Sequence, residues 1–346
     1  MTEDGMGRIR QAADAADLRE PRIRLVPFEE ITVGTVPAFL IKGLIPRVGL
    51  TIVWGPPKSG KSFWIFDAMM HVALGWEYRG RRVQQGPIVY VAAEGAEGFK
   101  ARVEGFRQNR MAEAIEGRVP FYLVPVNLDM LAEHAELIGA VRLALADTVP
   151  AAVVLDTLNR TLVGSETEDM PAYVRAADAI RTAFGCAVTI VHHCGVDGTR
   201  PRGHTSLTGA ADAQIAIKRA AGGNVVATVE WMKDGPEGDA ITSRLVPVNI
   251  GTDTDGDTIT TCIVEPVEDT EPVTTGPRLS RNQTTMFTIL HDAGGGGLTV
   301  EDWNERAREV GIGTKRKADL YDLREALKRK RVVHEYGGKW FAETKN

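Results

Sequence analysis

Residues 49–62 read GLTIVWGPPKSGKS, and this stretch predicts the fold of the chain. An apolar, β-branched run ends at Gly55, the spacing GxxxxGK[ST] follows without a mismatch, and Lys61–Leu74 is compatible with a helix. In a strand–loop–helix of this kind, backbone N–H groups and the helix N-terminus converge on phosphate oxygens. We therefore predict a phosphate-binding loop at Gly55–Ser62.

The residue types in this loop indicate its ligand. Lys61 is expected to reach the β- and γ-phosphates of a nucleoside triphosphate, and the Ser62 hydroxyl is expected to ligate Mg²⁺. We take ATP with Mg²⁺ as the ligand. The predicted binding residues are Gly55, Pro56, Pro57, Lys58, Ser59, Gly60, Lys61 and Ser62.

Apolar strands and amphipathic helices alternate after the loop. The strand patterns are PIVYVAAEG, FYLVPV, AAVVLDT and CAVTIVHH, and the helical stretches between them are 98–109, 130–146 and 170–184. This alternation predicts an α/β fold with a mainly parallel sheet and helices on both faces. The segments NVVATVEWMKD and ITSRLVPVNI flank the turn GPEG and predict an antiparallel extension.

Two acidic residues end strands of the predicted sheet. Asp156 closes AVVLD, where a Walker B aspartate holds Mg²⁺ and orients the loop serine. Glu94 follows VYVAA, where a general base is needed to activate water, and Glu97 is the alternative. We predict that Ser62 and Asp156 form the metal site.

The order of the motifs resembles a known family. The P-loop, AAEG, VVLDTLNR, TIVHHCG and RGHTSLTGAADA follow one another as in the RecA-core ATPases of the RepA and DnaB hexameric-helicase group. The phage and plasmid RepA-like AAA-family ATPases are the closer resemblance, over about residues 40–250. It implies that Glu94 is the catalytic base and that His193, beside His192, senses the γ-phosphate.

The resemblance also implies a basic residue that acts on the ATP of a neighbouring subunit. Lys233 in WMKDGPEG is the candidate, and Arg219 in AIKRAAGG is the alternative. Relatives often carry two basic residues here, whereas this chain has Trp231 and one lysine. A ring, commonly of six subunits, is implied with this arrangement.

Two loops at the same edge of the predicted sheet are candidates for binding nucleic acid. One spans residues 159–171, and the other, residues 195–205, contains Arg200 and Arg202. In the hexamers that the chain resembles, such loops line a channel for single-stranded DNA. Arginine side chains there would neutralise phosphates. Arg202 also belongs to the family motif and is alternatively a link between the nucleotide and the loop.

A second small unit is predicted near the C-terminus. Helical patterns over 282–292, 300–310 and 315–330 precede RVVHEYGGKWFAE, which predicts a hairpin turning at Gly337-Gly338. Three helices and a hairpin are typical of a winged helix, whose third helix reads a DNA groove. Lys315, Arg316 and Lys317 open that helix and are predicted to contact DNA; protein contact is the alternative for such a unit, and basic residues at a helix end can instead favour the helix dipole.

Four regions follow from these patterns. We predict an N-terminal arm over 1–44, a RecA-like core over 45–252, a linker over 253–279 rich in Asp, Thr, Glu and Pro, and a winged helix over 280–346. The 346 residues contain no apolar run long enough for a membrane span and no secretory signal, so the cytoplasm is the expected location. A net charge of −5 does not by itself mark a nucleic-acid binder.

The combined patterns predict an ATP-driven DNA translocase or helicase of phage- or plasmid-type replication or recombination. It is expected to form a ring on single-stranded or forked DNA. A recombinase-like or strand-annealing ATPase is one alternative. A regulatory DNA-binding protein, with an ATPase core that switches oligomeric state, is the other.

Overall fold

The computed structural model describes residues 25–32, 35–36, 38–93, 95–111, 118–195, 200–220, 223–233, 235–267, 280–313, 317–330 and 332–343. Met1–Pro37 forms one unit and Ala38–Asn346 another. The described part of the first unit contains the short 3₁₀ helix η1 (Phe28–Glu30).

The structured core begins earlier than the predicted limit at residue 45. Strands β1 (Phe39–Ile41) and β2 (Ile45–Pro46) pair antiparallel, and Leu40 and Leu44 are buried in the main core. The prediction of an arm that extends to residue 44 is therefore wrong for residues 39–44. The apolar side chains of this short hairpin gain more by burial than they would as an exposed arm.

A nine-stranded sheet dominates the part of the chain that the structure describes, in the order β11-β10-β9-β8-β3-β7-β6-β4-β5. The strands from β8 to β5 in this order run parallel. They are β3 (Gly49–Gly55), β4 (Ile88–Ala92), β5 (Phe121–Val124), β6 (Ala152–Asp156), β7 (Ala187–His193) and β8 (Ala213–Arg219). The predicted α/β fold with a mainly parallel sheet is confirmed.

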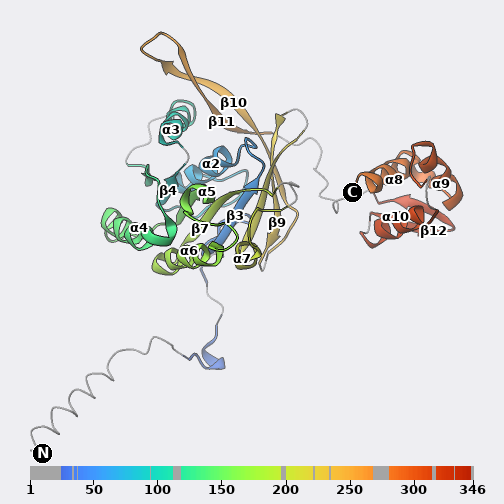
Figure 1. The fold of residues 1–346 in the computed structure, drawn as a ribbon, viewed down its shortest axis with the longest axis horizontal. Coiled ribbons are helices and arrows are strands. Elements are labelled where there is room, and N and C mark those ends of the chain that lie inside the picture. The colour runs from blue at the N-terminus through green and yellow to red at the C-terminus, as the bar shows by residue number, and fades with distance from the viewer. Residues whose placement is uncertain are drawn as a thin grey trace, which may run out of the picture. The chain divides into compact units, whose positions relative to one another are not determined.

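Helices cover both faces of this sheet (Figure 1). On one face, α2 (Lys61–Leu74) and α3 (Ala96–Arg110) pack through Trp64, Phe66 and Phe99. The other face carries α4 (Met130–Leu145), α5 (Leu158–Thr161), α6 (Met170–Phe184) and α7 (Thr205–Ala210). Strands buried on both faces read as continuous apolar runs, which explains why they were visible in the sequence.

The antiparallel extension is longer than predicted. Strands β9 (Val225–Met232), β10 (Ala240–Thr252) and β11 (Thr258–Pro266) continue the sheet beyond β8. The linker prediction over 253–279 is therefore wrong for β11, and residues 268–279 lie outside the described part of the chain. Pairing with β10 and packing under α3 stabilise β11: a Cβ on Gly105 would lie 2.4 Å from Thr261 Cγ2.

Residues 280–343 contain helices followed by a hairpin. The elements are α8 (Arg281–Asp292), η3 (Gly294–Gly296), α9 (Val300–Glu309), α10 (Lys317–Arg329), β12 (Val333–Tyr336) and β13 (Lys339–Ala342). Ser280 caps α8 in a capping box, and Thr299 caps α9. Leu320 and Leu327 of α10 are buried with Trp303, so this region has a hydrophobic core of its own. Among the described helices, none combines the length and apolar composition needed to cross a bilayer.

Candidate nucleotide site

The predicted phosphate-binding loop joins β3 to α2. Gly60 adopts the left-handed conformation (φ 98°) just before the first residue of α2. Gly55 lies so close to β8 that an added Cβ would be 2.1 Å from the carbonyl oxygen of Ile217. The two glycines therefore satisfy different constraints: one turns the loop into the helix, and the other allows two backbones to approach.

Lys61 bends back over its own loop. Its ammonium donates hydrogen bonds to the carbonyl oxygens of Gly55 at 3.0 Å and Pro56 at 2.8 Å. The residue is only 5% exposed, whereas Lys58 in the same loop is exposed. A buried ammonium held over a glycine-rich loop is well placed to exchange carbonyl oxygens for phosphate oxygens.

The loop also contains a buried hydroxyl that fits a phosphate ligand. Ser59 is 2% exposed, and its Oγ has no hydrogen-bond partner among the described residues. A Cβ added to Gly55 would lie 3.3 Å from this oxygen, which places the hydroxyl inside the loop. Buried hydroxyls without partners are uncommon, and a phosphate oxygen of a bound triphosphate would supply an acceptor for this one.

Asp156 lies beside the first turn of α2. Its Oδ1 accepts a hydrogen bond from Ser62 Oγ at 3.0 Å, and its Oδ2 accepts one from Tyr90 OH at 2.6 Å. Burial and the nearby Asp156 carboxylate raise the pKa of Tyr90 well above its usual value, so its hydroxyl remains a donor. The hydroxyl–carboxylate pair of Ser62 and Asp156 offers the hard oxygen ligands that Mg²⁺ prefers.

His193 reaches the same edge of the sheet. It pairs with Gly55 across β7 and β3, and its Nδ1 lies 3.5 Å from Lys61 Nζ. The preceding His192 is fully buried, its Nε2 lies 2.7 Å from the carbonyl oxygen of Arg202, and burial lowers its pKa. The two neighbouring histidines thus have different surroundings, as alternating strand residues should.

The structure brings the P-loop, Asp156 and His193 together, while Glu94 lies outside the described residues. Its neighbour Ala93 donates an N–H to the Asp156 carbonyl at 2.8 Å, and α3 begins at Ala96. The alternative base, Glu97, has a side chain that is 84% exposed and paired with Lys100. Tyr90 was not among the residues predicted for the site. The signal available in the sequence was its position in the strand pattern, two residues before Ala92 and therefore on the same face.

A profile of the AAA domain family, found in a comparison with known families, matches residues 19–199, which is more than half of the chain. The chain belongs to the AAA domain family. The matched region includes the loop, Asp156 and His193. The sequence has no significant match among curated proteins. A crystal structure of the RadB recombinase aligns at a TM-score of 0.42 and 20% identity, over 59% of this chain and 90% of that one.

In this AAA-family chain, the two loops predicted to contact DNA are bound to each other. Arg202 forms hydrogen bonds and an ion pair with the Glu166 carboxylate, which holds the pKa of Glu166 below its usual value. The Arg202 N–H also donates to the His193 carbonyl at 3.0 Å. Arg200 is exposed, whereas the Arg202 guanidinium is engaged by a carboxylate. This geometry favours the alternative role for Arg202, a link between the nucleotide edge and the loop.

The two candidates for a basic residue in trans lie at opposite edges of the sheet. Lys233 follows β9 at the edge where β3 begins; its N–H donates to the Asp212 carbonyl at 2.9 Å, and its Nζ lies 3.7 Å from Asp212 Oδ1. Thr51 of β3 pairs with Ala213 of β8, and Ala213 pairs with Met232, the residue before Lys233. From Thr51 to Gly55, where the P-loop begins, β3 is about 13 Å long. Arg219 ends β8 at the P-loop edge. Lys233 is thus remote from the P-loop of its own subunit.

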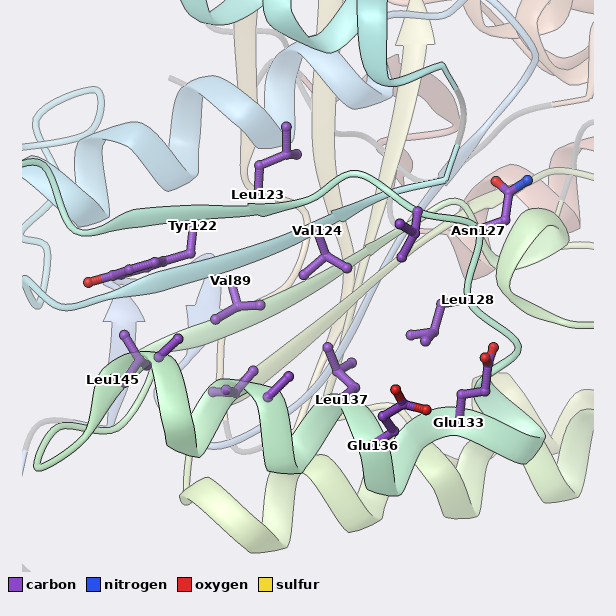
Figure 2. Close-up of a pocket in the computed structure, with 14 residues that line it drawn as sticks. Val89, Tyr122, Leu123, Val124, Asn127, Leu128, Glu133, Glu136, Leu137 and Leu145 are labelled. Carbon is purple, nitrogen blue, oxygen red and sulfur yellow. The ribbon is translucent and has the colours of Figure 1, made fainter.

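An apolar groove of about 320 Å³ lies elsewhere in the AAA-family core, between β5 and α4. Val89, Val124 and Leu137 line it (Figure 2). It lies on the α4 face, whereas Lys61 and Ser62 belong to α2 on the opposite face. The groove is therefore separate from the phosphate site.

The basic residues predicted to contact DNA near the C-terminus are outside or at the margin of the described structure. Lys315 and Arg316 lie outside the described residues, and Lys317 is the first residue of α10. Within α10, Arg324 is largely buried and donates a hydrogen bond to Asn304 Oδ1. That arginine therefore contributes to packing within residues 280–343.

Proposed function

We propose that this protein is a RecA-like, Mg²⁺-dependent ATPase that moves along or unwinds DNA in phage- or plasmid-type replication or recombination. The observation that carries the proposal is the grouping of Lys61, the Ser62–Asp156 pair and His193 at one edge of the sheet. This grouping supplies a cation for the phosphates, oxygens for a metal and a histidine in contact with the cation.

Each group has a defined task in this proposal. Lys61 binds the β- and γ-phosphates, and Ser62 and Asp156 hold Mg²⁺, which neutralises phosphate charge when bound. Glu94 accepts a proton from the attacking water. His193 contacts Lys61 and therefore senses whether the ammonium is bound to phosphate or to the loop carbonyls.

The nucleotide state passes from this edge to the proposed DNA loop through β7. His193 ends β7, and its carbonyl accepts the Arg202 N–H. Movement of the strand end would therefore move the segment that contains Arg200 and Arg202. In a ring, Arg200 contacts the phosphates of single-stranded DNA, and residues 280–346 form a winged helix that contributes further contacts through Lys315, Arg316 and Lys317.

Strand displacement on a forked duplex tests the proposal. We expect the wild-type protein with ATP and Mg²⁺ to separate a fluorophore–quencher fork, and Lys61→Ala to separate none. Hydrolysis that DNA stimulates without any unwinding would contradict the helicase assignment. Pairing of complementary strands would instead favour a recombinase, and tight binding to a single duplex sequence would favour a regulator.

A second prediction concerns assembly. If Lys233 completes a neighbour's site, Lys233→Ala should lower hydrolysis by about 10²-fold or more, because a charged group that faces the reacting phosphates is lost. Mixing Lys233→Ala with Glu94→Gln subunits should restore activity, since some interfaces then combine an intact Lys233 with an intact Glu94. Random assembly at equal amounts gives about a quarter of such interfaces in a closed ring.

The mixing experiment has a matched alternative in Arg219→Ala. Recovery with Arg219→Ala and not with Lys233→Ala would assign the trans role to Arg219. Absence of recovery with either variant, in mixtures shown by mass to contain both subunits, would contradict a shared site.

A further inference from the structure

Tyr90 is a fully buried residue of β4 whose hydroxyl contacts the proposed magnesium-site carboxylate. It donates to Asp156 Oδ2 at 2.6 Å, while Ser62 Oγ donates to Asp156 Oδ1 at 3.0 Å. Each carboxylate oxygen thus has a donor, and the two donors come from different elements, β4 and α2. A carboxylate bonded at both oxygens is restricted to one orientation.

The register of the sheet explains this contact. Ala92 of β4 pairs with Asp156 of β6, so Tyr90 lies two residues earlier on the same face of the neighbouring strand. A tyrosine side chain is long enough to span that diagonal, whereas a shorter hydroxyl side chain at this position is not. Tyr90 packs in the same core as α2, and Asp156 accepts a hydrogen bond from Ser62 at the start of that helix.

Packing determines where the hydroxyl lies. The Tyr90 ring contacts Phe99 at a centroid distance of 4.7 Å and Phe121 at 5.9 Å. Phe99 belongs to α3, and Phe121 to β5, so the ring is held between elements on two sides. These ring contacts restrict the position of the Tyr90 hydroxyl.

We propose that Tyr90 is a positioning residue that orients the Asp156 carboxylate so that Oδ1 faces Ser62 and the Mg²⁺ of a bound nucleotide. This inference rests on the proposed nucleotide site. Tyr90 contacts neither substrate nor metal in this arrangement. Its effect passes through Asp156, because it occupies the carboxylate oxygen that the metal site does not use.

Tyr90→Phe tests the inference because it removes the hydroxyl and keeps the ring. Binding of a fluorescent, non-hydrolysable ATP analogue is measured in EDTA and across a Mg²⁺ titration. In EDTA the variant should bind like the wild type. The Mg²⁺ concentration at half-saturation should rise about tenfold or more, the usual effect of losing a partner that orients a metal ligand.

Tyr173→Phe is the matched control. Tyr173 is also fully buried, but it packs on the opposite face of the sheet from Tyr90, and its hydroxyl lies 2.7 Å from Thr161 Oγ1. Both variants lose one buried hydrogen bond, so a merely structural role predicts similar losses of thermal stability and no change in the Mg²⁺ midpoint. The inference requires the midpoint to move in Tyr90→Phe and to stay in Tyr173→Phe.

The outcomes separate this inference from the proposed function. An unchanged midpoint in Tyr90→Phe, when Asp156→Asn shifts it, overturns the inference alone. Binding by the wild type that depends on neither Mg²⁺ nor Lys61 overturns the proposed site and the inference with it. As a second test, Tyr90→Phe/Asp156→Asn is compared with Asp156→Asn at a temperature below the unfolding transitions of both. Equal midpoints support action through Asp156, and a further tenfold weakening contradicts it.

Discussion

Replacing Lys61 with alanine is expected to lower ATP hydrolysis by about 10²–10³-fold, the usual cost of removing one preorganised group that stabilises charge on a reacting centre. The ammonium is the buried cation of the loop, and it rests on the carbonyl oxygens of Gly55 and Pro56. Alanine has no ammonium group that could bind the phosphate oxygens. Steady-state phosphate release measures the loss.

Thermal unfolding with and without ATP separates a binding defect from a folding defect. A ligand present at about 100 times its Kd stabilises the folded protein by about 2.7 kcal/mol. We expect the wild type to gain this stability and Lys61→Ala to gain little, while both proteins unfold cooperatively. Lys42→Ala, which changes an exposed lysine near β1, should behave like the wild type. Hydrolysis by Lys61→Ala at the wild-type rate would show that Lys61 is not part of the catalytic site.

Replacing Glu94 with glutamine is the second large effect that we expect. A general base contributes typically 10²–10⁴-fold, and glutamine keeps the size of the side chain without its proton affinity. ATP binding should persist and hydrolysis should fall by a factor in that range. Binding of a fluorescent ATP analogue and single-turnover hydrolysis measure the two steps separately.

Glu97→Gln is the matched control, three residues away on α3. Its carboxylate is 84% exposed and paired with Lys100, so its loss should leave hydrolysis near the wild-type rate. The reverse result, in which Glu97→Gln is inactive and Glu94→Gln is active, would assign the base to Glu97. If both variants hydrolyse ATP normally, the base lies on another element.

Local chemistry made much of this fold predictable. The helix after the P-loop spans Lys61–Leu74 as expected, with the left-handed Gly60 just before it and the left-handed Gly75 just after it. Apolar runs similarly marked the parallel strands. By contrast, β11 was not predicted, because its Thr-rich sequence and the acidic turn before it resemble a linker. Its stability comes from contacts with β10 and with α3, which is distant in the sequence. The function of the basic residues depends on assembly and stays a prediction.

The sequence by itself determined the phosphate loop, the parallel sheet and the strand-end positions of Asp156 and His193, because each depends on short-range spacing. Only the tertiary structure decided that Tyr90 bonds to Asp156, that Arg202 pairs with Glu166, and that Lys233 lies at the edge opposite the P-loop. These facts depend on which strands are neighbours and in what register. Register is a property of the whole sheet, since pairing energies from distant segments select it together.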